Sequence, residues 1–291
     1  MGVCGMTNAI KIRSKSRYVF ARVIIYIVFG IAAITTIFPY VWMVLASFKT
    51  GLEITTYPEQ IFPSSPSFDA YVDAFRKLNL GVGIKNTLIL EVFAIIFSPL
   101  VSALGAFSFA KLELPFKRTL LLILLSSMMI PYAALMLPQY QIWQSIQLVD
   151  TLGPLIIPSF FGSALMTFFF VQYMQGVPNE LFEAAKLDGA GYVRQFFGIC
   201  LPLIKPALTA QIVLTFVGTW NDYFVPSIYL TGMESKTVQL QLLSLQQQQN
   251  NLMDMNIVMA GSVLSSIPML LIYIFCQRFF VESLAISGIK G

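Results

Sequence analysis

The sequence contains no histidine, few charged residues and only three cysteines. Without histidine, the chain lacks the usual general base, the usual proton shuttle and the commonest metal ligand. Cys4, Cys200 and Cys276 are scattered along the chain, so they fit small apolar packing residues better than a disulfide or zinc framework. We therefore expect no catalytic residues, no metal site and no cofactor.

Two common binding motifs are also absent from the sequence. No glycine-rich loop is followed by Lys and Ser or Thr, so the chain binds no nucleotide through a loop of that kind. No basic cluster is interleaved with aromatic residues, which argues against nucleic acid as a partner. A membrane enzyme is disfavoured as well, because only scattered carboxylates remain as reactive groups.

The sequence is instead rich in apolar residues. Hydrophobic residues make up 57% of the 291 residues, charged residues make up 11%, and the mean hydropathy is +0.75. This composition implies that lipid surrounds much of the chain. Runs long enough to cross a bilayer, which takes roughly 20 residues, cover 19–46, 84–110, 119–146, 153–174, 206–230 and 256–281. The runs are continuous and not alternating, so they favour helices over a barrel.

The six runs predict an all-α, polytopic membrane protein with six transmembrane helices. They form one transmembrane domain, residues 19–281, between a basic tail at 1–18 and a C-terminal tail at 282–291. The third run contains Pro131 and Pro138, and we expect a kink at Pro131, where neighbouring helices can satisfy the freed carbonyl group. The glutamine-rich end of that run can lie at the membrane interface.

Lys and Arg are distributed unequally between the two sides of such a domain. If the N-terminal tail lies inside, 13 of the 18 basic residues lie on the inner side and five on the outer side. The positive-inside rule then predicts that both termini are cytoplasmic. The same orientation places the loop between the fourth and fifth runs, at about 175–206, in the cytoplasm.

The 175–206 loop contains the only long charged segment between apolar runs, and that segment predicts a short helix. Asn179 can cap its start, and Gly189 and Gly191 would end it. The exposed face would carry three small residues, Ala184, Ala185 and Ala190. A face with so little side chain allows another protein to approach closely.

The order of residues in this loop resembles a family motif. Glu183-Ala184-Ala185, then Asp188-Gly189-Ala190, then Leu201-Pro202, is similar to the EAA loop of ABC importer permeases. The resemblance implies a type I importer permease (MetI-like) bundle, whose loop forms a coupling helix that docks in a groove of a cytoplasmic ATPase. It assigns ATPase coupling to Glu183, Ala184, Ala185, Asp188, Gly189 and Ala190. The alternative is an ordinary amphipathic connector helix.

Three further stretches are similar to the carbohydrate branch of this family. They are residues 106–112 with Phe116-Lys117-Arg118, the sequence Trp220-Asn221-Asp222, and the terminus 283–291. The terminus resembles that of the maltose-type MalG subunit. That resemblance implies contact with the ATPases by Gly288, Ile289, Lys290 and Gly291.

Three polar side chains lie at predicted membrane depth, where an unpaired Asp costs about 2.5–3.5 kcal/mol. Glu91 lies about two turns into the second run, and Asn221 and Asp222 lie midway along the fifth. We interpret them as candidates for the substrate path, the alternative being structural hydrogen bonds to a neighbouring helix or subunit. Five aromatic residues can stack on sugar rings, although packing or an interfacial belt explains most of them: Tyr132, Tyr140, Trp143, Tyr223 and Tyr229.

Two segments lie on the predicted outer side. In residues 49–83, the apolar residues Phe68, Tyr71, Val72 and Phe75 have helical spacing. In residues 231–255, the polar run 246–251 predicts a solvated loop. Both segments lie where a solute-binding protein would dock.

The patterns and the resemblance predict the translocation-pathway subunit of an ATP-driven, binding-protein-dependent importer of an oligosaccharide or related carbohydrate. It would lie in the cytoplasmic membrane of a prokaryote. The resemblance implies a second homologous permease subunit, two cytoplasmic ABC ATPase subunits and an extracytoplasmic solute-binding protein. The chain itself would be non-catalytic and would contact the sugar and membrane lipid.

Two alternative transport functions stay open at this point. One is an ABC permease for a non-sugar solute. The other is a secondary transporter, which would need a coupling carboxylate pair in its core. Glu91 and Asp222 lie on different runs, and no inverted repeat is apparent, so the secondary transporter is the less favoured alternative.

Overall fold

The computed structural model describes the backbone of residues 4–247 and 254–288 and the side chains of residues 20–245 and 254–277. Every regular element in these residues is a helix. The chain divides into two compact units, one made of Met1–Tyr71 with Asn251–Val263 and one made of Val72–Asn250 with Leu264–Gly291. The predicted roles of Ile289, Lys290 and Gly291 and the polar residues 248–251 lie outside the described residues.

The first unit is built around the helix α1 (Cys4–Ala46), which is followed by α2 (Gly51–Thr56). α2 begins where the Thr50 side chain accepts a hydrogen bond from the backbone N–H of Glu53 at 3.2 Å. The ring of Phe48 lies 5.2 Å from that of Phe68 and 5.4 Å from that of Tyr71. These aromatic contacts fix the start of α3 (Asp69–Lys77), the helix that the apolar spacing predicts.

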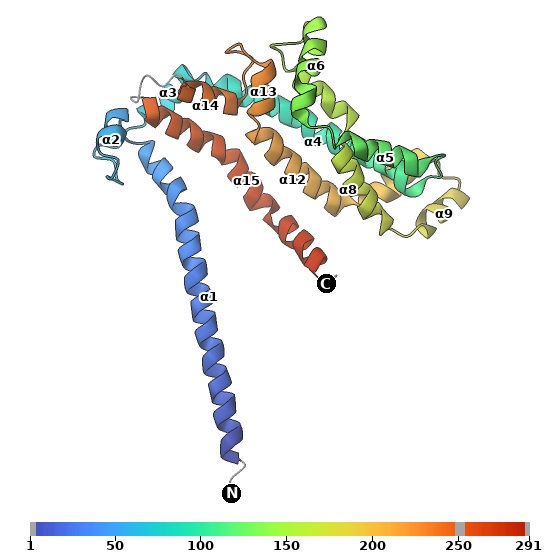
Figure 1. Ribbon diagram of the computed structural model, residues 1–291, viewed down its shortest axis with the longest axis horizontal. Coiled ribbons are helices and arrows are strands. Elements are labelled where there is room, and N and C mark those ends of the chain that lie inside the picture. Colours follow the sequence, from blue (N-terminus) through green and yellow to red (C-terminus); the bar gives the residue numbers. More distant parts are fainter. Residues whose placement is uncertain (1–3, 248–253, 289–291) are drawn as a thin grey trace. The chain divides into compact units, whose positions relative to one another are not determined.

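In the second unit, α4 (Leu80–Lys111), α8 (Ala164–Gln175) and α12 (Lys205–Asn221) lie side by side (Figure 1). Small residues on α4 are fully buried at this packing, among them Ala103 and Ala106. Small side chains let helix backbones approach closely, which is how helices associate in lipid.

The remaining helices of the chain are short, except for the last. They are α5 (Lys117–Ser127), α6 (Tyr132–Ser145), α7 (Gly153–Ile156), the 3₁₀ helix η1 (Ile157–Phe161), α9 (Glu180–Leu187), α10 (Tyr192–Gln195), the π-helix η2 (Phe196–Cys200), α11 (Leu201–Leu203), α13 (Phe224–Tyr229), α14 (Val238–Gln247) and α15 (Met255–Gly288). Figure 1 shows α9 and α14 at opposite ends of the second unit.

Among the described residues, four helical stretches are long and apolar enough to cross a membrane alone: Phe20–Ala46, Leu80–Lys111, Gly153–Gln175 and Met255–Gln277. Two bent pairs of helices pass the same test together, which gives up to six spans. One pair joins α5 to α6 with a bend of 89°, and Pro131 immediately precedes α6. The predicted break at Pro131 is therefore confirmed.

The fifth span differs from its prediction. The run 206–230 is not one helix, because α12 ends at Asn221 and α13 begins at Phe224. The Asp222 carboxylate accepts hydrogen bonds from the backbone N–H groups of Phe224 and Val225, at 2.9 and 3.2 Å, and so caps α13. Asn221 and Asp222 therefore lie at the end of a helix and not midway along a span.

Candidate functional site

The helix predicted in the 175–206 loop forms as α9, and it ends in a Schellman motif. Gly189 adopts a left-handed conformation with φ +77°. The N–H of Ala190 donates to Ala185 O at 2.9 Å, and the N–H of Gly189 donates to Lys186 O at 3.1 Å. These two bonds satisfy carbonyl groups that the helix end leaves free. Gly189 thus ends α9 as predicted, whereas Gly191, with φ −67°, precedes the next helix.

The start of α9 differs from the prediction. The Asn179 side chain makes no capping bond. Its Oδ1 atom instead accepts a hydrogen bond from Lys111 Nζ at 2.7 Å, and the same ammonium group donates to Val177 O at 2.6 Å. Asn179 is therefore a contact to the end of α4 and not a side-chain cap.

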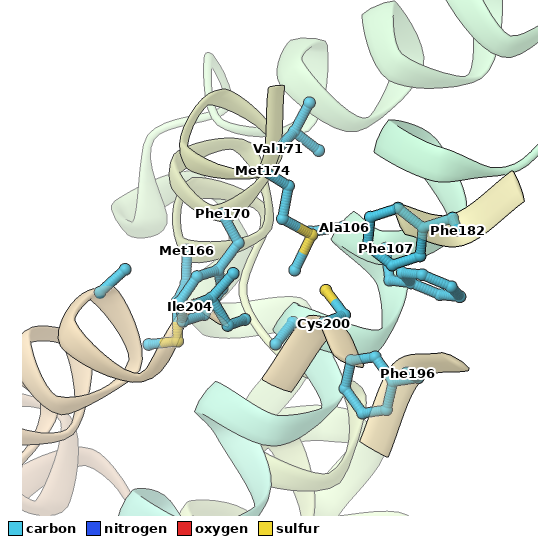
Figure 2. Packing of buried hydrophobic residues seen from close by; sticks show 12 residues of the cluster. Ala106, Phe107, Met166, Phe170, Val171, Met174, Phe182, Phe196, Cys200 and Ile204 are labelled. Carbon is cyan, nitrogen blue, oxygen red and sulfur yellow. The ribbon is translucent and has the colours of Figure 1, made fainter. Parts of the chain in front are cut away.

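One aromatic side chain of α9 points into the protein. Phe182 is 6% exposed, and its ring lies 5.9 Å from that of Phe107 on α4. The Phe107 ring in turn lies 5.6 Å from that of Phe196 in η2. Figure 2 shows these rings beside the sulfur atoms of Met174 and Cys200, in a cluster to which α4, α8 and η2 also contribute. Burial of Phe182 fixes which face of α9 points outward.

The outward face of α9 carries small and charged residues together with the leucine Leu187. Ala184 is exposed, and Ala185 and Ala190 are partly exposed. Leu187 is 90% exposed, a feature that the helical pattern of the sequence does not indicate. Four charged residues surround this face: Glu180, Glu183, Lys186 and Asp188. The groove of another protein can therefore contact the α9 backbone at the alanines and bind the Leu187 side chain.

The second unit also contains a cavity of about 600 Å³. Leu90, Ala94 and Ser98 of α4 line one wall at helical spacing. Thr215, Thr219 and Asp222 line another wall, and the aromatic residues are Tyr132, Trp143 and Tyr229. Polar groups and aromatic faces together suit a ligand with hydroxyl groups and flat apolar patches. The spacing of Thr215 and Thr219, one turn apart on α12, is the sequence signal that could have identified this wall.

The structure separates the three predicted path residues. Asp222 lines the cavity, but Asn221 and Glu91 are not among the lining residues. Asn221 is exposed and donates to Val217 O at 2.8 Å. Glu91 is 2% exposed, and within the described residues neither of its carboxyl oxygens has a hydrogen-bond partner. Of the predicted aromatic residues, Tyr140 does not line the cavity but stacks on Tyr229, which does. Tyr223 is exposed.

A single aspartate links two loops beside the cavity. Asp150 Oδ1 accepts bonds from Ser235 Oγ at 2.5 Å and from the N–H groups of Gly232 at 2.8 Å and Thr231 at 2.9 Å. Its own N–H donates to Tyr229 O at 2.8 Å. The Ser235 hydroxyl and the two N–H groups lower the pKa of Asp150 below its ordinary value of 3.8. Asp150 thus holds the 229–235 segment against the α6–α7 loop.

A family model described as "binding-protein-dependent transport system inner membrane component" matches residues 100–285. The matched region includes the 175–206 loop, α9 and most of the cavity lining. The chain belongs to this family. Members of the family are membrane subunits of transport systems, and with several apolar helices this member is a multi-pass membrane protein.

Relatives within the family have names that refer to sugars. An arabinooligosaccharides transport system permease protein, AraQ of Halalkalibacterium halodurans, is 31% identical over 266 residues, covering 90% of this chain and 94% of the relative. A lactose transport system permease protein, LacG of Rhizobium radiobacter, is 30% identical over 263 residues, covering 89% of this chain and 93% of the relative.

Solved structures confirm the permease fold. A crystal structure of a bacterial ABC transporter involved in the import of the acidic polysaccharide alginate contains a chain with 24% identity and a TM-score of 0.78. The match covers 91% of this chain and 98% of that one. A second structure, of an alginate ABC transporter in complex with an alginate pentasaccharide-bound periplasmic protein, matches with 16% identity and a TM-score of 0.65 over 92% of this chain and 95% of that one.

Proposed function

We propose that this chain is the translocation-pathway subunit of an ATP-driven, binding-protein-dependent importer of an oligosaccharide or related carbohydrate. The observation that carries the proposal is the exposed, alanine-lined face of α9, in a family member whose relatives have names of sugar permeases. The chain supplies no catalytic group to ATP hydrolysis. Hydrolysis takes place in two separate ATPase subunits on the cytoplasmic side, where both termini also lie.

In this proposal α9 is the coupling helix. Glu183, Ala184 and Ala185, with the turn Asp188-Gly189-Ala190, contact the ATPase groove, and the tail from Gly288 to Gly291 makes a further contact. When ATP closes the two ATPases, α9 moves with its groove. Because Phe182 is buried against Phe107 of α4, movement of α9 displaces the packed helices that enclose the cavity.

The cavity is the part of the sugar path that this chain provides. A second homologous permease subunit completes the path, and an extracytoplasmic solute-binding protein delivers the sugar. Trp143, Tyr132 and Tyr229 offer aromatic faces to sugar rings, and Asp222 offers a hydrogen-bond acceptor. Asn221 and Glu91 lie outside this cavity, and their part in the path stays a prediction.

Substitution of Ala185 by tryptophan tests the contact face. We expect Ala185→Trp to abolish oligosaccharide uptake, because the indole ring holds the ATPase surface away from the α9 backbone. Membrane insertion and thermal stability should stay unchanged. Ala184→Trp, at an exposed position, should have the same effect.

The control is Gln175→Trp, which adds the same side chain at an exposed position before α9. Uptake by cells that carry each variant is measured with radiolabelled oligosaccharides, alongside the amount of ATPase that co-purifies with the chain. Normal uptake by both alanine variants would overturn the assignment of the contact face.

A further inference from the structure

The last residue of α4, Lys111, makes three contacts with residues 177–182, which lead into α9 and form its first turn. Lys111 Nζ donates hydrogen bonds to Val177 O at 2.6 Å and to Asn179 Oδ1 at 2.7 Å. The same ammonium group lies 5.3 Å from the centroid of the Phe182 ring, a distance at which a cation and an aromatic face attract each other. All three partners lie more than sixty residues further along the chain. Lys111 thus joins two elements that the sequence does not connect locally.

A second residue of the same helix face strengthens this junction. Phe107 lies one turn before Lys111, and its ring contacts both Phe182 of α9 and Phe196 of η2. The end of α4 therefore contacts the helices on both sides of the Gly189 turn. The apolar contact sets how close the elements lie, and the ammonium group adds directional bonds at its edge.

The part of α4 beside the cavity is also packed closely, against residues 162 and 163. Ser102 Oγ accepts a hydrogen bond from the N–H of Ser163 at 2.9 Å. Gly162 has φ +71°, and a Cβ atom there would lie 2.8 Å from Ser102 Oγ, so only glycine fits against the serine. One turn earlier on α4, Ser98 lines the cavity. Ser98 and Lys111 are separated by about 20 Å of continuous helix, at a rise of about 1.5 Å per residue.

We propose that Lys111 is a positioning residue that fixes the start of α9 to α4, so that displacement of α9 is transmitted to the helix that lines the cavity. This inference rests on the proposed function of α9. Lysine suits the position because its ammonium group has three donors and the site offers two oxygen acceptors and an aromatic face. Without those bonds, α9 could follow the ATPase while α4 stays behind.

The inference predicts uncoupling and not loss of assembly. In Lys111→Met, the aliphatic stem keeps its packing while the donors and the charge are removed. We expect the reconstituted complex to assemble and to hydrolyse ATP, while the sugar transported per ATP hydrolysed falls by about fivefold or more, the lower end of typical coupling between sites. Asn179→Ala should cause a smaller fall, because it removes one acceptor of the two.

The conservative variant and a matched control separate coupling from charge and from folding. Lys111→Arg keeps hydrogen-bond donors at this position, so it should restore most of the transport per ATP. Lys117→Met removes a basic charge from the start of α5 on the same predicted side and should leave the ratio unchanged. Equal ratios for Lys111→Met and the unaltered chain would overturn the inference, as would a fall in Lys111→Arg as large as that in Lys111→Met.

A crosslinking measurement distinguishes this failure from failure of the proposed function. Leu187→Cys places a thiol at a position that is 90% exposed in the native chain. In the complex, a crosslink from this thiol to an ATPase subunit supports the proposed role of α9, with the chain bearing only its native cysteines as background. If the crosslink forms and Lys111→Met transports normally, only the inference about Lys111 fails. If no ATPase is crosslinked, the proposed function fails first.

Discussion

At Asp150, one carboxylate oxygen accepts hydrogen bonds from Ser235, Gly232 and Thr231, and these bonds stabilise the charged form of the side chain. The pKa is lower in the folded chain than its ordinary value of 3.8. The resulting stabilisation is complete above pH 3.8 and is lost as the pH falls through the lowered pKa of the folded state. The loop around Gly232 should therefore become less ordered as the pH falls through this range.

Hydrogen exchange at the Thr231 and Gly232 amides, corrected for intrinsic rates, tests this expectation. In the native chain, protection should fall as the pH drops below 3.8. In Asp150→Asn, protection should be lower at neutral pH and should show no such acid transition. Ser235→Ala removes the largest cause of the pKa shift, so its transition should move up toward 3.8. Identical pH profiles for the native chain and Asp150→Asn would contradict the prediction.

The role of a single residue can be predicted from the sequence when it depends only on residues nearby in the chain. The sequence identifies Gly189 as a helix end, because glycine readily takes the left-handed conformation that ends an amphipathic helix. The sequence predicts Asn179 as a helix cap, but its side chain instead accepts a hydrogen bond from Lys111. Nothing near Asn179 in the sequence indicates this contact. The exposure of Leu187 was missed for the same reason, since it follows from the burial of Phe182 against α4.

The end of α9 depends on the backbone conformation of one glycine. A Cβ atom at Gly189 would meet nothing within 4 Å, so the cost of Gly189→Ala comes from its φ of +77° alone. We expect this substitution to destabilise the turn by about 1–2 kcal/mol. Exchange of the Ala190 amide should then accelerate by a factor of about 5–30, with little effect elsewhere.

Gly191→Ala is the matched control for this prediction. Gly191 also has no atom within 4 Å of an added Cβ, but its φ of −67° suits any residue. Alanine there should leave the turn unchanged or stabilise it by about 0.4–1 kcal/mol, because it restricts the unfolded chain. If both variants shift exchange equally, the Schellman geometry does not determine the stability of this turn.

Helix breaks show what a sequence pattern can and cannot reveal about elements. The break before α6 was predicted because Pro131 interrupts an apolar run. The sequence does not predict the break between α12 and α13, because apolar residues continue on both sides of Asp222 and make it resemble a polar group in the middle of a span. Its carboxylate is a helix cap, and Pro226 lies in the first turn of the next helix, so a local signal was present. The π-helix η2 has no comparable signal in its sequence.

The class of the whole molecule followed from composition, because apolar runs of this length require lipid around them. The cavity could not be predicted in the same way, since α4, α6 and α12 each contribute only a few side chains to it. Partners were accessible only through the resemblance of the 175–206 loop to a family motif. Composition and apolar runs alone predict a membrane helix bundle, and the motif adds the prediction of ATPase subunits that would drive transport.

The energy source of transport is a property of the whole assembly, and the cavity predicts which source it is. Asp222 is the one carboxyl group among the described lining residues, and it already accepts two backbone N–H bonds. Glu91 lies on α4 outside the lining, so the described lining of this cavity holds no carboxylate pair to which an ion or proton could bind during each cycle. We therefore expect proteoliposomes that contain this chain with the proposed partners (a second permease, two ATPases and loaded binding protein) to accumulate sugar only with ATP on the ATPase side. A non-hydrolysable ATP analogue should abolish accumulation, whereas ionophores that collapse ion gradients should leave its rate unchanged. Accumulation that survives the analogue but stops with the ionophores would identify an ion-coupled transporter instead.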